Sequence, residues 1–246
     1  MSDRVFIAGT GTDVGKTVVT AGILRYLRQR EVDAVVMKPV QTGADTAQQP
    51  WRAPDLEAHW RAAAFDPQDE PYSRFCPYLY APACSPHLAA RLAGDAIDPK
   101  VIHQNARALL ETHEYLIVEG AGGIYVPLTD RYTNLDLMKE MACPIILVAH
   151  VALGTINYTL LSLESMNHAG LKVAGIILST PEPLSESARF IAEDNPAAIE
   201  AFTEVPIFGI VPWLEDITHA EAPGWDAFEE AIDWELLLTQ LGLWHD

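Results

Sequence analysis

Residues 6–22 read FIAGTGTDVGKTVVTAG, and this stretch decides the expected fold. It begins as an apolar strand, passes through a glycine-rich turn and reaches Gly15, Lys16 and Thr17 where a helical pattern starts. Backbone N–H groups in such a turn can converge on a phosphate, and the helix N-terminus behind them favours negative charge. The stretch therefore predicts a phosphate-binding loop (P-loop) between a strand and a helix.

The spacing of this loop is a variant of the usual one. The pattern G-x-x-x-x-G-K-[ST] would put its first glycine at position 10, where this chain has Thr10 between Gly9 and Gly11. An ordinary glycine-rich turn is the alternative interpretation. The coincidence of strand, turn, Gly-Lys-Thr and helix favours the phosphate loop, with Lys16 for the β- and γ-phosphates and Thr17 for Mg²⁺.

The composition excludes several classes of partner. The chain has 246 residues, of which 49% are apolar, and its formal net charge is −18. Such a charge repels nucleic acid and anionic lipid, so neither is an expected partner. No segment resembles a signal peptide or reaches membrane-spanning length, and we expect a cytoplasmic protein. The cysteines, Cys76, Cys84 and Cys143, lack metal-ligand spacing and are expected to be reduced.

Strand and helix patterns alternate along the chain, without an internal repeat or a linker-like break. Expected strands are Val5–Ala8, Ala34–Met37, Tyr115–Val118, Ile145–Ala149, Val173–Leu178 and Ile207–Val211. Expected helices are Lys16–Arg30, Asp55–Ala64, Pro99–Thr112, Thr133–Met141, Ile156–Ala169, Leu184–Phe202 and Trp225–Leu241. Residues 41–87 otherwise read as irregular and form a candidate functional region. The apolar strands predict an α/β fold, a single domain 1–246 with a parallel sheet and helices on both faces.

Unusual residues follow the strands of this predicted sheet. Ligands of open α/β sheets bind beyond the carboxyl ends of the strands. Lys38 follows one strand within the sequence MKPVQTG. A lysine there can extend its ammonium group into solvent, but it can also neutralise a developing anion beside Lys16. In so acidic a chain, a second cation near the loop points to an anionic ligand.

A carboxylate and three glycines follow another strand, in LIVEGAGGIYVPLTD. Glu119 at this point suits Mg²⁺, which prefers one or two carboxylates together with phosphate oxygens. The alternative is a solvated glutamate in a glycine-rich loop. Asp55 is a candidate second ligand, but the sequence alone does not separate it from Asp45, Asp66 or Asp69. A further glycine, Gly154, precedes a helix whose start could bind a carboxylate or could be a plain helix N-terminus.

Taken together, these stretches resemble the dethiobiotin synthetase family. The matching segments are GTGTDVGKT, KPVQTG, SPH, VEGAGGIYVPLTD, LGTIN, HAGL, AGII and VPWL, in the family's order up to about residue 215. The variant loop is itself a feature of that family, whereas the last thirty residues show no such resemblance. The resemblance implies an ATP- and Mg²⁺-dependent ligase of biotin biosynthesis that converts 7,8-diaminononanoate and CO₂ to dethiobiotin through a carbamate and a carbamic-phosphoric anhydride.

The resemblance also implies roles for individual residues. Lys38, Lys16 and Thr12 would face the carbamate and the transferred phosphate. Thr17, Asp55 and Glu119 would hold Mg²⁺. The nucleotide would be bound by Asp13, Val14, Gly15, Lys16, Thr17, Val18, Asp55, Glu119, Gly120, Ala121, Gly122, Ser179, Thr180, Pro212, Trp213 and Leu214. The diamine substrate would be bound by Thr42, and its distant carboxylate by Gly154, Thr155, Ile156 and Asn157 of the partner subunit in a homodimer.

Three positions depart from the family pattern. Gly11 stands where many members have aspartate, and Tyr158 replaces a frequent histidine. Ser179-Thr180 stands where the family pattern has Asn-Asp or a similar pair that reads adenine. One short hydroxyl cannot pair with two atoms of the adenine edge as an amide can. We therefore expect weak discrimination between ATP and other nucleoside triphosphates.

Two other functions are compatible with a variant phosphate loop. ATP-dependent switch proteins of the partitioning and septum-positioning type act through partner or membrane binding. Their loop typically carries an early lysine, where this chain has Ala8-Gly9-Thr10, and they often end in a basic helix, where this chain is acidic. An amidotransfer-type cobyrinate ligase needs a glutamine-hydrolysing domain, for which this chain is too short.

Overall fold

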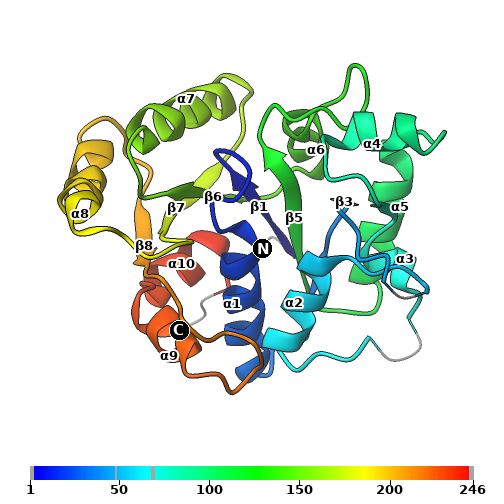
Figure 1. Ribbon diagram of the computed structural model, residues 1–246, viewed down its shortest axis with the longest axis horizontal. Helices are drawn as coiled ribbons and strands as arrows, with labels where there is room; N and C mark the ends of the chain where they lie inside the picture. Colours follow the sequence, from blue (N-terminus) through cyan, green and yellow to red (C-terminus); the bar gives the residue numbers. More distant parts are fainter. Residues whose placement is uncertain (1–2, 48, 68–69, 244–246) are drawn as a thin grey trace.

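A six-stranded parallel sheet forms the centre of the protein in the computed structural model, which describes residues 3–47, 49–67 and 70–243 (Figure 1). In spatial order, the strands are β2 (Ala34–Met37), β5 (Tyr115–Gly123), β1 (Arg4–Gly9), β6 (Ile145–His150), β7 (Val173–Ser179) and β8 (Ile207–Val211). Two short strands, β3 (Val40–Thr42) and β4 (Tyr78–Tyr80), pair in parallel as a separate sheet. This architecture confirms the predicted α/β class.

The central strands are apolar because helices cover both faces of the sheet. All four residues of β2 are buried, and so are Val5 to Gly9 of β1. Burial on both sides removes the period of two that a half-exposed strand would show. The strands all run in one direction, so their carboxyl ends and the loops that follow them meet at one edge.

The helices fall into two layers. They are α1 (Lys16–Gln29), α2 (Pro54–Ala62), α3 (Tyr72–Phe75), α4 (Pro86–Leu92), α5 (Pro99–Leu110), α6 (Asn134–Met141), α7 (Thr155–His168), α8 (Glu186–Glu200), α9 (Gly224–Glu230) and α10 (Trp234–Leu241). Right-handed crossovers require α1 on one face and α5, α6 and α7 on the other. Helices α2 and α9 contact α1, whereas α8 contacts α7 (Figure 1).

Three expectations differ from the structure. The segment 41–87 holds more regular structure than the one expected helix, since it contains β3, α2, α3, β4 and the start of α4, although irregular backbone connects these short elements. Strand β5 continues past Val118 to Gly123, because residues up to Gly123 still pair with β1. The single helix expected at Trp225–Leu241 is two helices, because Asp233 caps a new one by accepting a hydrogen bond from the Leu236 N–H.

The C-terminal helices close one side of α1. The ring of Phe228 on α9 lies so close to Gly22 of α1 that a side chain at position 22 would meet it. Trp234 of α10 stacks on Tyr26 of α1 with ring centroids 3.4 Å apart, and the Arg30 guanidinium covers the Tyr26 ring. We call the packing of Phe228 and Trp234 on Gly22 and Tyr26 the aromatic wall of α1. It packs the helix that follows the phosphate loop against the end of the chain.

Two further expectations can be compared with the described residues. The three cysteines are free thiols, with Cys76 and Cys143 buried. In the part of the chain that the structure describes, no helix has the length and apolar character needed to cross a membrane.

Candidate active site

The predicted phosphate loop connects β1 to α1 at the carboxyl edge of the sheet. Gly15 has a φ of 93° directly before α1, which an L side chain rarely adopts, and a side chain there would also collide with Ser179. The loop is tied back on itself, because Lys16 Nζ donates a hydrogen bond to the Gly11 carbonyl at 2.8 Å. Backbone N–H groups and the start of α1 are thereby arranged as an anion cradle.

A cavity of about 780 Å³ opens beside this loop. Its lining includes twelve of the residues predicted from the sequence, which are Thr12, Asp13, Gly15, Lys16, Thr17, Val18, Lys38, Thr42, Asp55, Glu119, Ala121 and Gly122. They come from the loop, α1, β3, α2, β5 and the residue that follows β2. The topology thus brings distant motifs together at one edge of the sheet.

Lys38 is the centre of the charged cluster in this cavity. The lysine is 3% exposed, and its Nζ lies 2.6 Å from Asp55 Oδ2 and 2.6 Å from Glu119 Oε1. Its backbone N–H donates to the Phe75 carbonyl, which fixes the chain where β2 ends. Burial alone would lower the pKa of Lys38, but the carboxylates of Glu119 and Asp55 raise that pKa above its usual range. This lysine therefore does not extend into solvent.

Glu119 is fully buried and ionised. Burial would raise the pKa of its carboxyl group, but Lys38 and His59 hold that pKa well below its usual range. The hydroxyl of Thr17 donates to Glu119 Oε1 at 3.3 Å. The expected alternative of a solvated glutamate in a loop is therefore wrong, since the side chain is enclosed on strand β5.

The donor set suits a magnesium ion. Thr17, Asp55 and Glu119 offer one hydroxyl and two carboxylates, and both carboxylates are within reach of a single cation, as their shared contact with Lys38 shows. Hard oxygen ligands of this kind are those that Mg²⁺ takes, together with phosphate oxygens and water. Within the described ranges, no three His, Cys, Asp or Glu side chains form a metal cluster.

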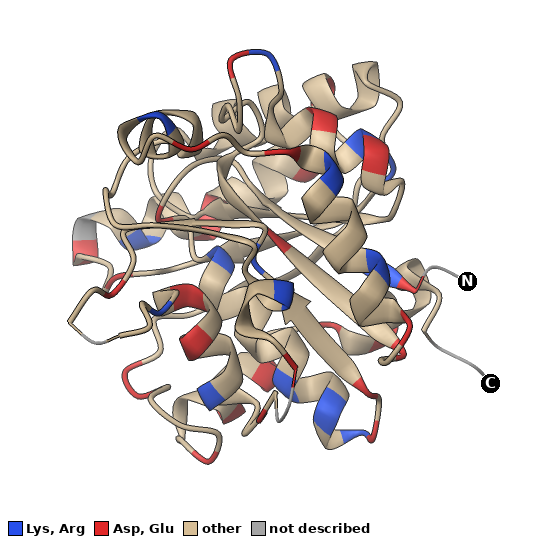
Figure 2. Ribbon diagram, turned by 90° about the vertical axis from the view of Figure 1, so that its right-hand side faces the viewer, with Lys and Arg blue, Asp and Glu red and all other residues tan. Residues whose placement is uncertain are grey.

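Lys16 lines the same cavity, and its pKa is lowered there. Burial, followed by the positive charge of Lys38, lowers the pKa of Lys16 to about 8. A bound phosphate would favour the charged form of the lysine. Among the described residues that line this cavity, only Lys16 and Lys38 are basic. Figure 2 shows acidic segments scattered over the ribbon, and this cavity is also lined by Asp13, Asp55 and Glu119, so the two lysines lie beside carboxylates rather than in a purely positive pocket.

The structure distinguishes the aspartates that the sequence left open. Asp55 is the second residue of α2, and its side chain lines the cavity. Asp45 lies in a short antiparallel bridge with Arg52, and Asp66 lines a different pocket with His113. Asp69 lies outside the described residues. Asp55 is the one of the described three that shares Lys38 with Glu119.

Several predicted residues lie outside this cavity. A Cβ atom at Gly120 would meet the Phe6 ring instead of the cavity. Val14 lines a neighbouring cavity of about 470 Å³. Thr155 also lines that second cavity, at the start of α7. The remaining predicted residues that do not line the main cavity are Gly154, Ile156, Asn157, Ser179, Thr180, Pro212, Trp213 and Leu214.

The expected base-reading pair sits at the end of β7. Ser179 is 2% exposed and lies against Gly15 of the phosphate loop, and its carbonyl accepts from the Val151 N–H. The Thr180 N–H donates to the Val211 carbonyl of β8. Among the three residues after β8, Trp213 is 46% exposed, whereas Leu214 is buried. Neither Ser179 nor Thr180 carries an amide side chain to this region.

Other residues of the site were not among those predicted. Gln41, Cys84 and Ser85 line the main cavity. His59 is fully buried on α2, and its Nε2 lies 2.8 Å from Glu119 Oε2. A spacing of four residues between Asp55 and His59 on a predicted helix puts both on one face, and this signal could have identified His59.

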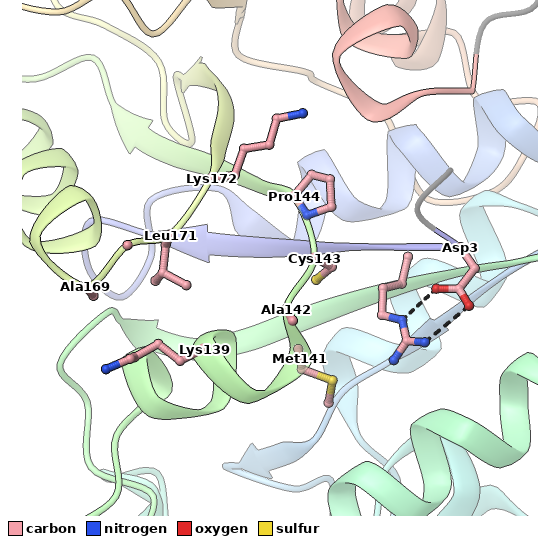
Figure 3. A pocket seen from close by; sticks show the side chains of 11 residues that line it. Asp3, Lys139, Met141, Ala142, Cys143, Pro144, Ala169, Leu171 and Lys172 are labelled. Atoms are coloured by element: carbon pink, nitrogen blue, oxygen red, sulfur yellow. Dashed lines mark hydrogen bonds and ion pairs between the residues drawn. The ribbon is translucent and has the colours of Figure 1, made fainter.

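A third cavity lies at the opposite edge of the sheet (Figure 3). It measures about 680 Å³ and lies where β1, β6 and β7 begin. Lys139 and Lys172 line it, but Figure 3 shows their side chains extending in different directions. Ligands of parallel sheets bind at the carboxyl edge, and the phosphate loop is there as well. We therefore assign the site to the cavity beside the loop.

Comparisons with known proteins identify relatives of the whole arrangement. Residues 3–221 match the AAA domain family. The chain is 39% identical to the ATP-dependent dethiobiotin synthetase BioD of Anoxybacillus flavithermus, over 88% of this chain and 94% of the relative. It is 42% identical to the ATP-dependent dethiobiotin synthetase BioD of Halalkalibacterium halodurans, over 86% of this chain and 85% of the relative.

Solved structures show a similar fold at low identity. The septum site-determining protein MinD of Pyrococcus horikoshii, solved with Mg-ADP, has a TM-score of 0.57 at 16% identity and covers 98% of this chain and 95% of its own. The apo McdA structure from Cyanthece has a TM-score of 0.55 at 15% identity, with 98% of each chain covered. At these identities, the likeness supports the fold alone.

Proposed function

Because the chain belongs to the ATP-dependent dethiobiotin synthetase family, we propose that it closes the ureido ring of dethiobiotin from 7,8-diaminononanoate, CO₂ and ATP. The observation that carries this proposal is the meeting of Lys38, Asp55 and Glu119 beside the phosphate loop in one cavity. The reaction gathers two anions, a carbamate and a triphosphate. Buried cations and a metal site beside a phosphate cradle suit that demand.

The reaction has three steps. One amine of the substrate adds to CO₂ and releases a proton, which gives a carbamate. A carbamate oxygen then attacks the γ-phosphorus of ATP, ADP leaves, and a carbamic-phosphoric anhydride forms. The second amine attacks the carbonyl carbon, the C–O bond to phosphate breaks, and a further proton is released as the ring closes. The phosphoryl group thus converts a carbamate oxygen into a leaving group.

The cavity residues divide this work. We assign the triphosphate to the loop from Asp13 to Val18, where Lys16 stabilises the β- and γ-phosphates. Lys38 and Thr12 stabilise the carbamate and the transferred phosphoryl group, and Thr42 contacts the diamine. Asp55, Glu119 and Thr17 would hold Mg²⁺, which supplies positive charge to the phosphate oxygens when it is bound. Asp55 and Glu119 would be available to the metal if Lys38 turned from them to the nucleotide.

We further propose that the protein is a cytoplasmic homodimer in which the start of α7 receives the substrate carboxylate from the partner's site. Gly154 is in the left-handed region with a φ of 95°, where a close backbone turn opens the helix. Three apolar side chains around this helix start are unusually exposed, Leu153 at 83%, Tyr158 at 60% and Leu161 at 58%. Exposed apolar clusters mark contact surfaces, and a second copy of the chain would cover this one.

Phosphate release tests the activity directly. With Mg-ATP and bicarbonate, the purified protein should release phosphate only when 7,8-diaminononanoate is added, and dethiobiotin should accumulate with it. Phosphate release measured with and without the diamine distinguishes the ligase from a switch ATPase. Hydrolysis that proceeds without the diamine, and is unaffected by adding it, would exclude the ligase and favour the partitioning-type function.

Weak selection of the nucleotide base is expected from Ser179. Its single hydroxyl lies against Gly15 and offers no amide to the adenine edge. Loss of one such contact costs about 0.5–1.5 kcal/mol, or roughly threefold to tenfold in affinity. We therefore expect kcat/KM values for ATP, CTP, GTP and UTP within about a hundredfold of one another. A larger preference for ATP, measured at fixed Mg²⁺ and diamine, would mean that other groups near Trp213 read the base.

A further inference from the structure

His59 and Asp55 share one face of helix α2. They are four residues apart, so their side chains lie one above the other on that face. Asp55 reaches Lys38 in the cavity, whereas His59 is fully buried behind it. The His59 Nε2 atom lies 2.8 Å from Oε2 of Glu119, a carboxylate that is also fully buried. Helix α2 therefore carries one carboxylate of the proposed metal site, Asp55, and contacts the other, Glu119, through His59.

The two oxygens of Glu119 face different neighbours. Oε1 faces the cavity side, where it lies 2.6 Å from Lys38 Nζ and accepts from the Thr17 hydroxyl. Oε2 faces away from these groups and toward the His59 ring. The ring nitrogen is close enough for a hydrogen bond to Oε2, although the two groups are not aligned for one. Without His59, Oε2 would be a buried charged atom with no polar side chain beside it among the residues that the structure describes.

We infer that His59 is a positioning residue that fixes the rotation of the Glu119 carboxylate, so that Oε1 is presented to the metal. This inference rests on the proposed function only through the metal site formed by Thr17, Asp55 and Glu119. In this arrangement, α2 supplies one ligand directly through Asp55 and orients the other through His59. Metal ligands that are carboxylates are commonly held by such outer hydrogen bonds, whose loss typically weakens metal affinity by about 10- to 100-fold.

A role in packing alone makes a different prediction. If the ring only filled space on α2, an apolar side chain of similar length would replace it without affecting the metal. If the ring orients the carboxylate, the replacement must carry an N–H group that reaches Oε2. A glutamine amide reaches about as far as Nε2 of histidine, whereas methionine fills the space without a donor. The comparison of His59→Gln with His59→Met therefore separates the two roles.

Mn²⁺ binding in the presence of ADP provides the test, since it needs neither the diamine nor turnover. Mn²⁺ would be titrated into wild-type and variant protein at a fixed ADP concentration, and the free Mn²⁺ concentration would be measured by electron paramagnetic resonance. We expect His59→Met to weaken Mn²⁺ binding by about 10- to 100-fold and His59→Gln to stay within about threefold of the wild type. His59→Asn, whose amide is too short to reach Oε2, serves as a second loss variant if the methionine variant does not fold.

Trp60→Phe is the matched control. Trp60 is also buried on α2, and its Nε1 has no hydrogen-bond partner among the described residues, so the change perturbs packing without removing a described polar contact. It should lower the melting temperature and leave Mn²⁺ binding unchanged. Wild-type Mn²⁺ affinity in His59→Met, or equal losses in the Met and Gln variants, would overturn the positioning role alone. A wild-type protein that does not bind Mn²⁺ with ADP would overturn the proposed metal site and this inference together.

Discussion

Lys38→Gln is expected to lower kcat by about 10²-fold or more, because it removes an electrostatic stabiliser of the carbamate and the transferred phosphoryl group. Nucleotide affinity should change much less, because the loop and Lys16 remain. Lys139→Gln is the matched control, since it makes the same change of charge on an exposed lysine at the opposite edge of the sheet. Steady-state kinetics with all substrates saturating would measure the effect. An equally small loss in both variants would mean that Lys38 has no part in the chemistry.

The same variant should also be less stable without metal. Lys38 neutralises Asp55 and Glu119 in this structure, and its removal leaves a fully buried carboxylate without its cation. Breaking a buried ion pair in this way typically costs about 3–5 kcal/mol of unfolding free energy. Mg²⁺ could take the place of the lysine between the two carboxylates, so the variant should gain more stability from Mg²⁺ than the wild type does. Denaturant unfolding with Mg²⁺ and with a chelator would measure that difference.

Gly209→Ala is expected to lower the unfolding free energy by at least about 4 kcal/mol, among the largest effects that a single substitution produces. A Cβ atom at this position of β8 would overlap the carbonyl oxygen of Ala231. The backbone cannot move away easily, because the Asp233 N–H donates to the Phe208 carbonyl at 2.7 Å and residues 209 and 232 form a bridge. Strand β8 and the segment between α9 and α10 would have to separate.

Gly94→Ala provides the comparison for this stability measurement. Gly94 also has a positive φ, but apart from its neighbours in the chain no described residue has an atom within 4 Å of a Cβ atom there. Only the conformational cost of a left-handed alanine applies, which is about 1–2 kcal/mol. Chemical denaturation would give both values. A loss at Gly209 no greater than that at Gly94 would show that the contact between β8 and the segment joining α9 to α10 can relax around a methyl group.

The sequence predicted the regular elements well where burial patterns were strong. The bounds of Ala34–Met37 and Ile207–Val211 are those expected, since each is an apolar run with polar or proline-containing flanks. Strand β5 was predicted too short because its glycines resemble a loop. The hydrogen bonds of these glycines depend on pairing with β1, and a sequence pattern does not show which strands are neighbours.

The candidate site was predicted only up to the identity of its motifs. The phosphate loop and Lys38 directly follow strands, whereas Glu119 lies within β5, and the shared edge of the parallel sheet brings all three together. The choice of Asp55 over Asp45 depends on where α2 packs within the segment 41–87, which local propensity does not determine. The contact between His59 and Glu119 joins residues sixty positions apart, and only the folded chain brings them together.

The aromatic wall of α1 changes how the end of the family match should be understood. The match stops at residue 221, just before α9, although Phe228 and Trp234 from the following segment pack on Gly22 and Tyr26. A shortened protein designed from the alignment would therefore strip cover from the helix that carries Lys16 and Thr17. The lack of a family match over this segment therefore does not make it dispensable, because its rings pack directly on α1.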